Sequence, residues 1–599
     1  MKKNFNIIKI LMKNYWKLFI FQCFMVLVST FISCISTFSI KILIDILTYS
    51  SEAEYLANVI DPVSIFITTK VYGGFDFLKA NVWVFSFILV GIAIAMALLR
   101  CLRMLIRSYL NTHTSAQLQK YLFDEIVHLP YPTIKKMQNG DILQTCTKDL
   151  DTIRDFVIIQ TQIVFYTFSM LIISFTILYF INWKLALVSI VILPSLFIYS
   201  YFLIKPVRKR YKLTDDSEGK MCAKITENLE GIRVVKAYNN EEYEINNFEK
   251  YLEDYKVKLI NWRKLSSFFF SSSDILVFGQ MIASSLYAIF LALAGEITIS
   301  SVILASTYVS YIVWPFRDVA TMLSNYARVL AALDRISVIV DAPKEDLESG
   351  KIFDIEGNIE FKDVSFTFND ADTPTLKNIN LKINKGETVA ILGKTGSGKS
   401  TLAYLLTRLY DYQEGEILID NVPITEIQKH HLRKNVAIIL QEPFLFSKSI
   451  MNNLNIYDDK KDQEKIYSAA EIAQISETIE NFPNKYDTIL GEKGVNLSGG
   501  QKQRLSIARG IIQNSPILVM DDSLSAVDTE TDIEIRSALK KKMKDTTCLI
   551  ITHRIATAKT ADKIIVLENN TISEMGTYDE LINKEGLFKR IAEIQAKIE

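Results

Sequence analysis

Six stretches in the first half of the chain contain no charged residue, and each is long enough to cross a lipid bilayer. About 20 apolar residues, rising ~1.5 Å each, span a hydrocarbon layer of about 30 Å. Backbone polar groups cannot stay unpaired in that layer, so helices are the expected structure. We therefore predict a polytopic α-helical membrane domain with six transmembrane helices, at residues 18–40, 80–99, 156–183, 185–204, 275–295 and 297–316.

The composition agrees with a membrane protein and excludes some other classes. Of 599 residues, 49% are hydrophobic, with 34 Phe, 27 Tyr and only 12 Pro. The 67 basic and 67 acidic residues cancel, so nothing indicates a nucleic-acid partner. The six cysteines form no metal-binding or paired spacing, and we predict free thiols. The basic, amphipathic residues 1–17 lack a cleavable-signal pattern and are predicted to form an interfacial helix.

The spacing of the spans predicts their orientation. Only Lys184 separates the third span from the fourth, and only Glu296 separates the fifth from the sixth. The two long connectors, 100–155 and 205–274, must then lie on one side of the membrane, and both open with clusters of Lys and Arg. The positive-inside rule places these connectors and both termini in the cytoplasm, which predicts a multi-pass protein of the cytoplasmic cell membrane.

Each connector has the pattern of charged helix with a break near its middle. The breaks fall in "HLPYPTIKKMQNGD" (128–141) and "ENLEGIRVVKAYNNEE" (227–242). Two helical arms of about 25 residues would reach roughly 40 Å beyond the membrane and end in a turn suited to docking. We expect the docking partner to lie further along the chain.

The second half of the chain has a different pattern. An acidic, polar stretch at 341–358 is predicted to link the membrane domain, 18–340, to a domain at 359–599. Short runs rich in Ile and Val alternate there with helical segments, which is typical of an α/β domain with a largely parallel sheet.

The segment "TVAILGKTGSGKSTLAYLL" reads as a strand, a glycine-rich turn and a helix. In such a turn Gly393, Gly396 and Gly398 let backbone N–H groups close around phosphate oxygens. Lys399 can reach the outer phosphates, and the Ser400 hydroxyl suits magnesium. The predicted nucleotide-binding loop comprises Gly393, Lys394, Thr395, Gly396, Ser397, Gly398, Lys399, Ser400 and Thr401.

Further motifs follow other predicted strands and helices. The apolar run 517–521 ends in Asp521, which is placed to hold magnesium, and Asp522 comes next. Gln441 follows one strand, in "ILQEPFLF", and His553 follows another, in "CLIITHR". A phosphate-facing helix start is predicted in "LSGGQ", that is Leu497, Ser498, Gly499, Gly500 and Gln501.

Taken in this order, the motifs resemble the ATP-binding cassette of ABC transporters over residues 359–599. The upstream half, with six spans and long arms, resembles an ABC exporter of the multidrug type. The resemblance implies an α/β P-loop cassette fused to the membrane domain, with ATP and Mg²⁺ as cofactors. It implies catalytic roles for Asp522, His553 and Gln441, metal contacts from Ser400, Gln441 and Asp521, adenine stacking by Phe368, and a D-loop ending in Asp528.

One membrane domain and one cassette make half of such a transporter. The glycine-rich loop, 393–400, and the strand 517–521 correspond to the family's Walker A and Walker B motifs, and residues 497–501 correspond to its signature motif. In the family, each ATP lies between the Walker motifs of one chain and the signature motif of another. The resemblance therefore implies dimerisation, with residues 497–501 acting on the ATP that the partner binds.

Asp522 departs from the family pattern, because members with full turnover usually have glutamate there. Aspartate is one methylene shorter, which draws the carboxylate back by about 1.5 Å, and a misplacement of about 1 Å can cost roughly a hundredfold in rate. Heterodimeric exporters pair a chain of this kind, whose signature is intact, with one that has Glu and an altered signature. We predict such a heterodimer, in which this chain's own site is slow; a homodimer with an adequate Asp522 stays open.

The sequence leaves the substrate open. Polar and aromatic residues within the spans are candidates for a cavity that accepts a small amphipathic substrate, but interhelical packing and interface anchoring are the favoured explanation. They are Gln160, Gln162, Tyr166, Gln280, Tyr287, Tyr308, Tyr311 and Trp314. The predicted function is ATP-driven export of an amphipathic, drug-like compound. A dedicated peptide, natural-product or lipid exporter and an ATP-gated regulatory subunit are the alternatives.

Overall fold

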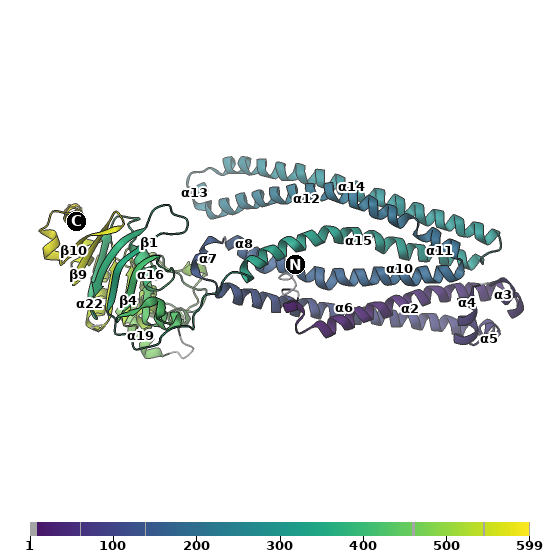
Figure 1. Cartoon of the computed structure of the whole chain (residues 1–599), viewed down its shortest axis with the longest axis horizontal. Helices are drawn as coiled ribbons and strands as arrows, with labels where there is room; N and C mark the ends of the chain where they lie inside the picture. The colour runs from purple at the N-terminus through teal and green to yellow at the C-terminus, as the bar shows by residue number, and fades with distance from the viewer. Residues whose placement is uncertain are drawn as a thin grey trace. The chain divides into compact units, whose positions relative to one another are not determined.

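The structure is a computed structural model that describes residues 7, 9–59, 61–137, 139–457, 462–542 and 545–597. The chain forms two compact units (Figure 1). A helical unit contains residues 1–127 and 137–342, and an α/β unit contains residues 128–136 and 343–599. All six cysteines are free, as predicted.

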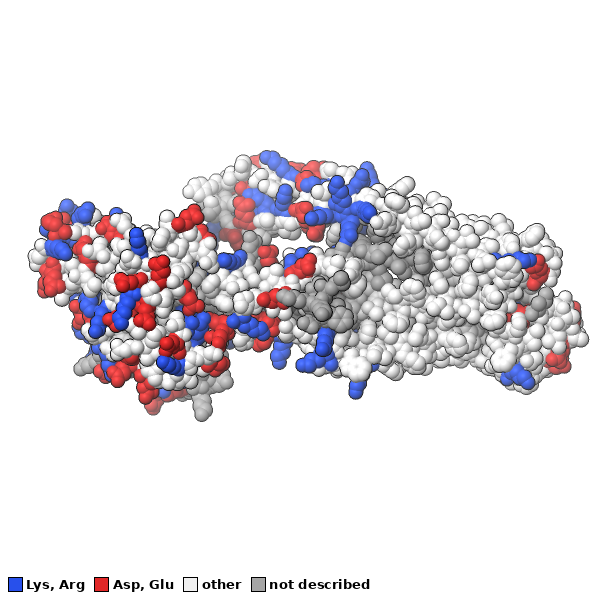
Figure 2. Space-filling model, in the orientation of Figure 1, with Lys and Arg blue, Asp and Glu red and all other residues white. Residues whose placement is uncertain are grey.

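Within the described residues, five helices of the first unit are long and apolar enough to cross a membrane. They run over Trp16–Thr48, Val82–Val127, Gly140–Ile181, Trp183–Glu230 and Glu241–Leu293. A shorter apolar helix, Ile299–Pro315, falls on the sixth predicted span. Figure 2 shows a long face of this unit on which few charged residues appear. The apolar helices confirm a membrane domain, and the exact number of spans stays a prediction.

The helical unit is divided into elements as follows. The long ones are α2 (Trp16–Thr48), α6 (Val82–Val127), α10 (Thr161–Ile181), α12 (Ile192–Glu230), α14 (Glu241–Leu293) and α15 (Ile299–Val340). The short ones are α3 (Glu52–Asn58), α4 (Pro62–Phe66), η1 (Ile67–Val71), α5 (Phe75–Ala80), α8 (Asn139–Gln144), η2 (Thr145–Asp149), α9 (Leu150–Asp155), η3 (Phe156–Gln160), α11 (Trp183–Ile190) and α13 (Ile232–Ala237). In the predicted interfacial segment 1–17, residues 7, 9–12 and 16–17 are helical, the last two as the start of α2, and residues 1–6 and 8 lie outside the described residues.

Several of the polar residues in the predicted spans pack between helices. Tyr308 is fully buried and donates a hydrogen bond of 2.7 Å to the backbone oxygen of Cys34. The Tyr311 hydroxyl lies 3.1 Å from the Thr37 hydroxyl, and Gln280 donates to the Val188 oxygen at 2.6 Å. Tyr287 and Trp314 pack against the same core. For these five residues the structure supports interhelical packing.

Helix α2 continues beyond the charge-free stretch that ended at residue 40, because its next charges are buried and paired. Lys41 is 1% exposed, and its ammonium lies 2.6 Å from a carboxylate oxygen of Asp61 and 3.2 Å from one of Asp45. The Ser300 hydroxyl on α15 also donates to Asp45. Buried charges persist only when they are paired in this way, and the pattern of charge-free residues could not reveal such pairing.

Both predicted breaks in the arms are present. Helix α6 ends at Val127 and is followed by α7 (Tyr131–Lys136). In the second arm α12 ends at Glu230, α13 covers Ile232–Ala237, and α14 begins at Glu241. Helix α7 groups with the α/β unit, so the first arm's turn is part of that unit's structure.

The α/β unit contains two sheets. The larger has the strand order β10-β9-β3-β8-β7-β6, in which β9, β3, β8, β7 and β6 are parallel and β10 is antiparallel. The smaller, antiparallel sheet has the order β2-β1-β4-β5. The strands are β1 (Ile359–Phe366), β2 (Leu376–Ile383), β3 (Thr388–Gly393), β4 (Glu414–Ile419), β5 (Val422–Pro423), β6 (Val436–Ile439), β7 (Ile517–Asp521), β8 (Thr547–Ile551), β9 (Lys563–Glu568) and β10 (Thr571–Gly576).

Apolar side chains cover both faces of the larger sheet. On β7, Val519 joins one core cluster, while Leu518 and Met520 join another. A strand covered on both faces reads as a continuous apolar run, which is the pattern seen in the sequence. The helices of this unit are α16 (Lys399–Leu406), α17 (Lys429–Asn435), α18 (Ile450–Leu454), α19 (Gln463–Ile472), α20 (Ser476–Glu480), α21 (Gly499–Ile512), α22 (Thr529–Lys542), α23 (Ile555–Ala558), α24 (Tyr578–Ile582) and α25 (Leu587–Ala596), with short 3-10 turns η4 (Ile424–Glu426), η5 (Lys485–Asp487) and η6 (Glu492–Gly494).

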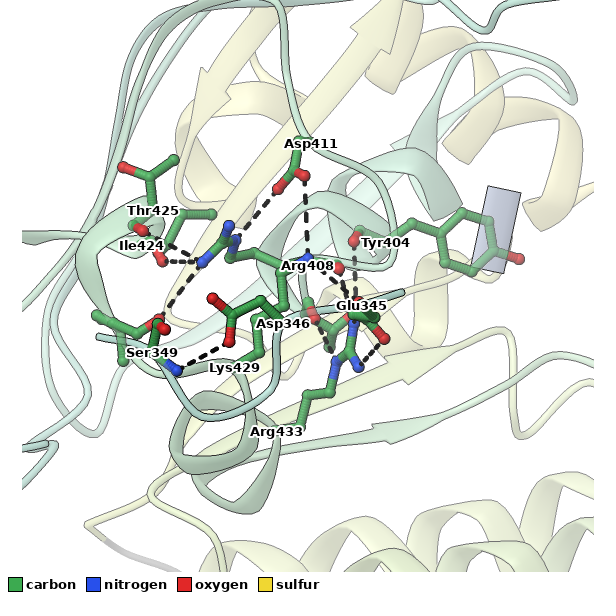
Figure 3. Close-up of polar contacts among 12 residues, drawn as sticks. Glu345, Asp346, Ser349, Tyr404, Arg408, Asp411, Ile424, Thr425, Lys429 and Arg433 are labelled. Atoms are coloured by element: carbon green, nitrogen blue, oxygen red, sulfur yellow. Dashed lines mark hydrogen bonds and ion pairs between the residues drawn. The ribbon is translucent and has the colours of Figure 1, made fainter. Parts of the chain in front are cut away.

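The predicted linker, 341–358, packs onto the α/β unit from residue 343 onward (Figure 3). The Glu345 carboxylate accepts two hydrogen bonds from the Arg433 guanidinium, at 2.7 and 2.9 Å, and one from Lys429 at 3.1 Å. Burial raises the pKa of the Glu345 carboxyl, but the two cations outweigh burial and hold that pKa below its usual range. The start of the linker is thereby fixed to α17.

Replacing Glu345 with glutamine is expected to lower the free energy of unfolding of the α/β unit by about 2 kcal/mol at neutral pH, because two cations lose a largely buried partner. A carboxyl whose pKa is lower in the folded chain stabilises it above the unfolded pKa, and this stabilisation disappears as the pH falls through the folded pKa. Thermal unfolding of the full chain at several pH values should show the two proteins converging in acid. Glu585→Gln, which breaks an exposed pair with Lys589, is the matched control and should change little.

Candidate nucleotide-binding site

Four predicted motifs meet at one edge of the larger sheet. The glycine-rich loop follows β3, Asp521 ends β7, His553 follows β8, and Gln441 follows β6. These four strands are parallel and adjacent, so their carboxyl ends lie side by side. Open α/β sheets bind ligands at this edge.

Close backbone packing requires two glycines of the loop, and the backbone conformation favours a third. Gly393 has φ 155°, and a Cβ there would lie 2.5 Å from the backbone oxygen of Leu567. Gly398 has φ 91°, and a Cβ there would lie 2.7 Å from the backbone oxygen of Thr375. Gly396 also has a positive φ, of 85°. The loop therefore closes tightly at the start of α16, with backbone N–H groups available for an anion.

Buried polar groups within the loop fit a phosphate ligand. The Lys399 ammonium donates to the backbone oxygens of Gly393 and Lys394, at 2.9 and 2.8 Å. Burial lowers the pKa of Lys399, and the carboxylates of Asp521 and Asp522 oppose that effect. The Ser397 hydroxyl is buried, and no described residue is hydrogen-bonded to it. Lys394 and Thr395 are exposed, and Thr401 is buried.

Asp521 and Ser400 form the part of the site that suits magnesium. Asp521 is 3% exposed, and its side chain is hydrogen-bonded to that of Ser400. Burial is the main cause of a raised pKa at Asp521. No cluster of three or more His, Cys, Asp or Glu side chains able to hold a metal occurs among the described residues. Magnesium bound with a nucleotide needs only one or two protein oxygens, so this donor set fits it.

Asp522 lies beside this group in an unusual backbone conformation. Its φ is 44°, and its N–H donates to the Ile551 oxygen at 2.9 Å, which continues the pairing of β7 with β8. Burial raises the pKa of the Asp522 carboxyl, and His553, Arg554 and Lys399 offset part of that rise. Burial and the charge of Lys399 lower the pKa of His553, so its imidazole is neutral at neutral pH.

Gln441 and Phe368, two further predicted site residues, lie in different surroundings. Gln441 is exposed, and its side chain makes no hydrogen bond with another described residue. The Phe368 ring packs edge-on against Tyr410, with centroids 5.1 Å apart, and is half-buried. The ammonium of Lys135, on α7, lies 5.4 Å from the centre of the same ring. The contacts of Lys135 and Tyr410 with the Phe368 ring were not predicted, because neither residue belongs to a motif.

The signature segment caps its own helix. Ser498 caps α21 by accepting from the Gln501 N–H at 3.3 Å, while the Ser498 N–H donates to the Gln501 side chain at 2.8 Å. Leu497 is buried, and Gly499 begins the helix. A Cβ on Gly500 would lie 2.9 Å from the backbone oxygen of Ala526. The loop that contains Ala526 thus packs directly on the start of α21.

Residues 523–528 form the loop that contains Ala526. Two residues that the sequence motifs did not single out hold this loop in place. Gln503, on α21, donates to the Ser525 hydroxyl and accepts from the Ala526 N–H. Arg554 donates to the backbone oxygen of Ser525 at 2.9 Å. Asp528 accepts from the Thr531 N–H at 2.9 Å, at the start of α22. The Asp528 side chain therefore stabilises the start of α22 within this chain.

Comparison with known proteins identifies the family. Residues 19–316 match the ABC transporter transmembrane region, and residues 376–525 match the ABC transporter cassette. The Bacillus subtilis protein YgaD, named provisionally as a multidrug export ATP-binding/permease protein, is 32% identical over 79% of this chain and 82% of its own. The chain belongs to the ABC transporter family.

Other matches to this ABC exporter agree in fold and differ in named substrate. An ATP-dependent lipid A-core flippase of Saccharophagus degradans is 31% identical over 81% of this chain and 82% of its own. The structure of a bacterial Atm1-family ABC exporter with ATP bound superimposes with a TM-score of 0.82 at 22% identity, and covers 98% of this chain and 99% of that one. The exporter is thus a multi-pass membrane protein with a cytoplasmic cassette that couples ATP hydrolysis to transport.

Proposed function

We propose that this exporter moves an amphipathic substrate out across the cytoplasmic membrane as one half of a heterodimer, in which its own Walker site turns over slowly. The observation that carries this proposal is Asp522 next to Asp521, together with an intact signature segment at 497–501. The partner would be a second half-transporter with Glu at the equivalent position.

In the proposed site, residues 393–401 bind the ATP phosphates and Phe368 stacks on adenine. Ser400, Asp521 and Gln441 would hold Mg²⁺, which neutralises phosphate charge. The one ring N–H of neutral His553 would donate a hydrogen bond to the outer phosphate. Residues 497–501 would contact the ATP bound by the partner. Asp528 would lie at the same interface, because it ends the loop 523–528 that packs on the start of α21.

The short side chain explains why the site would be slow. A general base must come within hydrogen-bond reach of the water that it activates. Asp522 starts from a constrained backbone, held by the Ile551 oxygen, so the main chain cannot readily move forward to make up the missing methylene. Its raised pKa favours proton acceptance but does not restore reach.

Purification of the chain alone and with the candidate partner tests the proposal. We expect weak ATPase activity from the lone chain and brisk activity from the pair. Asp522→Glu should raise turnover at this chain's own site by about tenfold or more. A stable dimer of the lone chain with brisk ATPase activity would show a homodimer instead.

A lipid substrate is the second candidate, because relatives such as the Saccharophagus degradans protein are named lipid A-core flippases. Uptake of a labelled lipid and of an amphipathic dye into inside-out vesicles, with and without ATP, separates the two. If neither moves although both chains are present and bind ATP, a regulatory role takes their place.

A further inference from the structure

A cavity of about 520 Å³ lies within the helical unit, between α2, α6 and the η3–α10 segment. Its polar lining consists mainly of Gln22, Arg100, Arg103, Arg107, Gln162 and Tyr166. The sequence had offered Gln162 and Tyr166 as residues that could line a cavity, and the structure places both in this one. The arginines, by contrast, were considered in the sequence only as indicators of the orientation of the spans.

The three arginines follow the helical repeat. Positions 100, 103 and 107 on α6 are three and four residues apart, so they share one face. Arg103 donates to the Ser29 hydroxyl at 2.7 Å. In the part of the chain that the structure describes, none of the three is ion-paired with a carboxylate, and none of the cavity's lining residues is acidic.

Such charges at the cytoplasmic end of a membrane span are costly without a counter-ion. A single arginine there can extend toward the lipid headgroups. Three that line one cavity instead create a local positive charge that favours an anion.

Two buried glutamines add unpaired hydrogen-bonding atoms to the same wall. Gln22 is 0% and Gln162 is 7% exposed. The Gln22 amide nitrogen donates to the Arg103 backbone oxygen at 3.0 Å and to the Gln162 side-chain oxygen at 3.5 Å. The Gln22 oxygen and the Gln162 nitrogen have no hydrogen-bond partner among the residues that the structure describes. The unpaired Gln162 N–H groups can donate to an oxyanion, whereas the unpaired Gln22 oxygen requires a donor such as a hydroxyl.

We propose that this cavity binds an amphipathic anion, with a phosphate, sulfate or carboxylate head on the arginines and an apolar tail against Val26, Met104 and Ile163. Guanidinium groups suit such heads because they can donate two hydrogen bonds to one oxyanion. The proposal rests on the proposed export function and narrows its substrate class from amphipathic to anionic and amphipathic.

Equilibrium binding without ATP tests the site. The probes are a fluorescent alkyl phosphate and an alkyl trimethylammonium of the same chain length, added to the full chain in phosphatidylcholine nanodiscs. We expect the phosphate to bind at least about tenfold more tightly than the ammonium. Replacing Arg103 and Arg107 together with glutamine should weaken phosphate binding by about a hundredfold, while the paired lysine replacements should weaken it less.

Lys220→Gln, which removes an exposed charge from α12 outside the cavity, is the matched control and should leave binding unchanged. Unaltered ATP binding shows that each variant is folded. Adding phosphatidylglycerol to the nanodiscs distinguishes the sources of the anion: competition with the probe indicates a lipid headgroup, and its absence indicates a free solute. Equal binding of both probes, or unchanged phosphate affinity in the double glutamine variant, would overturn the proposal. Intact phosphate binding without ATP-dependent transport would count against the proposed function alone.

Discussion

Gly500→Val is expected to reduce ATP turnover of the assembled transporter by at least about a hundredfold. Even a Cβ at this position would lie 2.9 Å from the backbone oxygen of Ala526, so the added side chain must move the start of α21 or the loop that ends at Asp528. Under the proposed arrangement both segments face the partner's ATP, where hydrolysis is fast. ATPase activity of the purified pair measures the effect.

Gly219→Val is the control for this substitution, since Gly219 lies within α12 with open space around its Cβ position. Its turnover should stay close to that of the wild type. ATP binding by the cassette of the Gly500→Val chain should also be retained, because that site uses residues 393–401. Full turnover in the Gly500→Val pair would mean that this signature segment does not serve the fast site.

Lys399→Ala is expected to weaken ATP binding by this chain's own cassette by about a hundredfold, because a buried ammonium at the glycine-rich loop is lost. Turnover of the assembled transporter should fall less than in Gly500→Val, since hydrolysis at this site is slow to begin with. Equilibrium binding of a fluorescent ATP analogue to the lone chain gives the affinity.

Lys394→Ala is the matched control in the same loop. Lys394 has a 73% exposed side chain, with Glu568 3.8 Å away, so its loss should change ATP affinity little. Equal losses of ATP affinity in the two variants would show that affinity depends on the net charge of the loop. The buried position of Lys399 would then not be important for binding.

The sequence predicted the membrane domain, the α/β domain and the residues at the sheet edge, because each rests on a local pattern. Six charge-free stretches identify apolar helices, and a strand before the glycine-rich loop with a helix after it identifies a phosphate-binding turn. Asp521 and Lys399 lie far apart in the sequence, yet β7 and β3 are parallel strands with only β8 between them, so their carboxyl ends lie at the same edge of the sheet.

Contacts between distant segments could not be predicted in the same way. The pairing of Lys41 with Asp61 depends on how α2 packs against the short helix α4, which Asp61 precedes, and no periodicity in the sequence encodes this contact. Gln503 and Arg554 contact the Ser525 hydroxyl and backbone atoms of residues 525–527, so these contacts depend on the conformation of the loop. The arginines of α6 can be interpreted as part of an anion-binding cavity only because the structure places Gln22 and Gln162 beside them.

The central claim is that fast hydrolysis depends on the partner's carboxylate and not on Asp522. Asp522→Asn tests it most directly, because an amide of nearly the same size cannot accept the proton from the attacking water. With the partner present, we predict ATP turnover within about twofold of the wild type. A loss of about a hundredfold would contradict the account and make Asp522 a principal catalytic base.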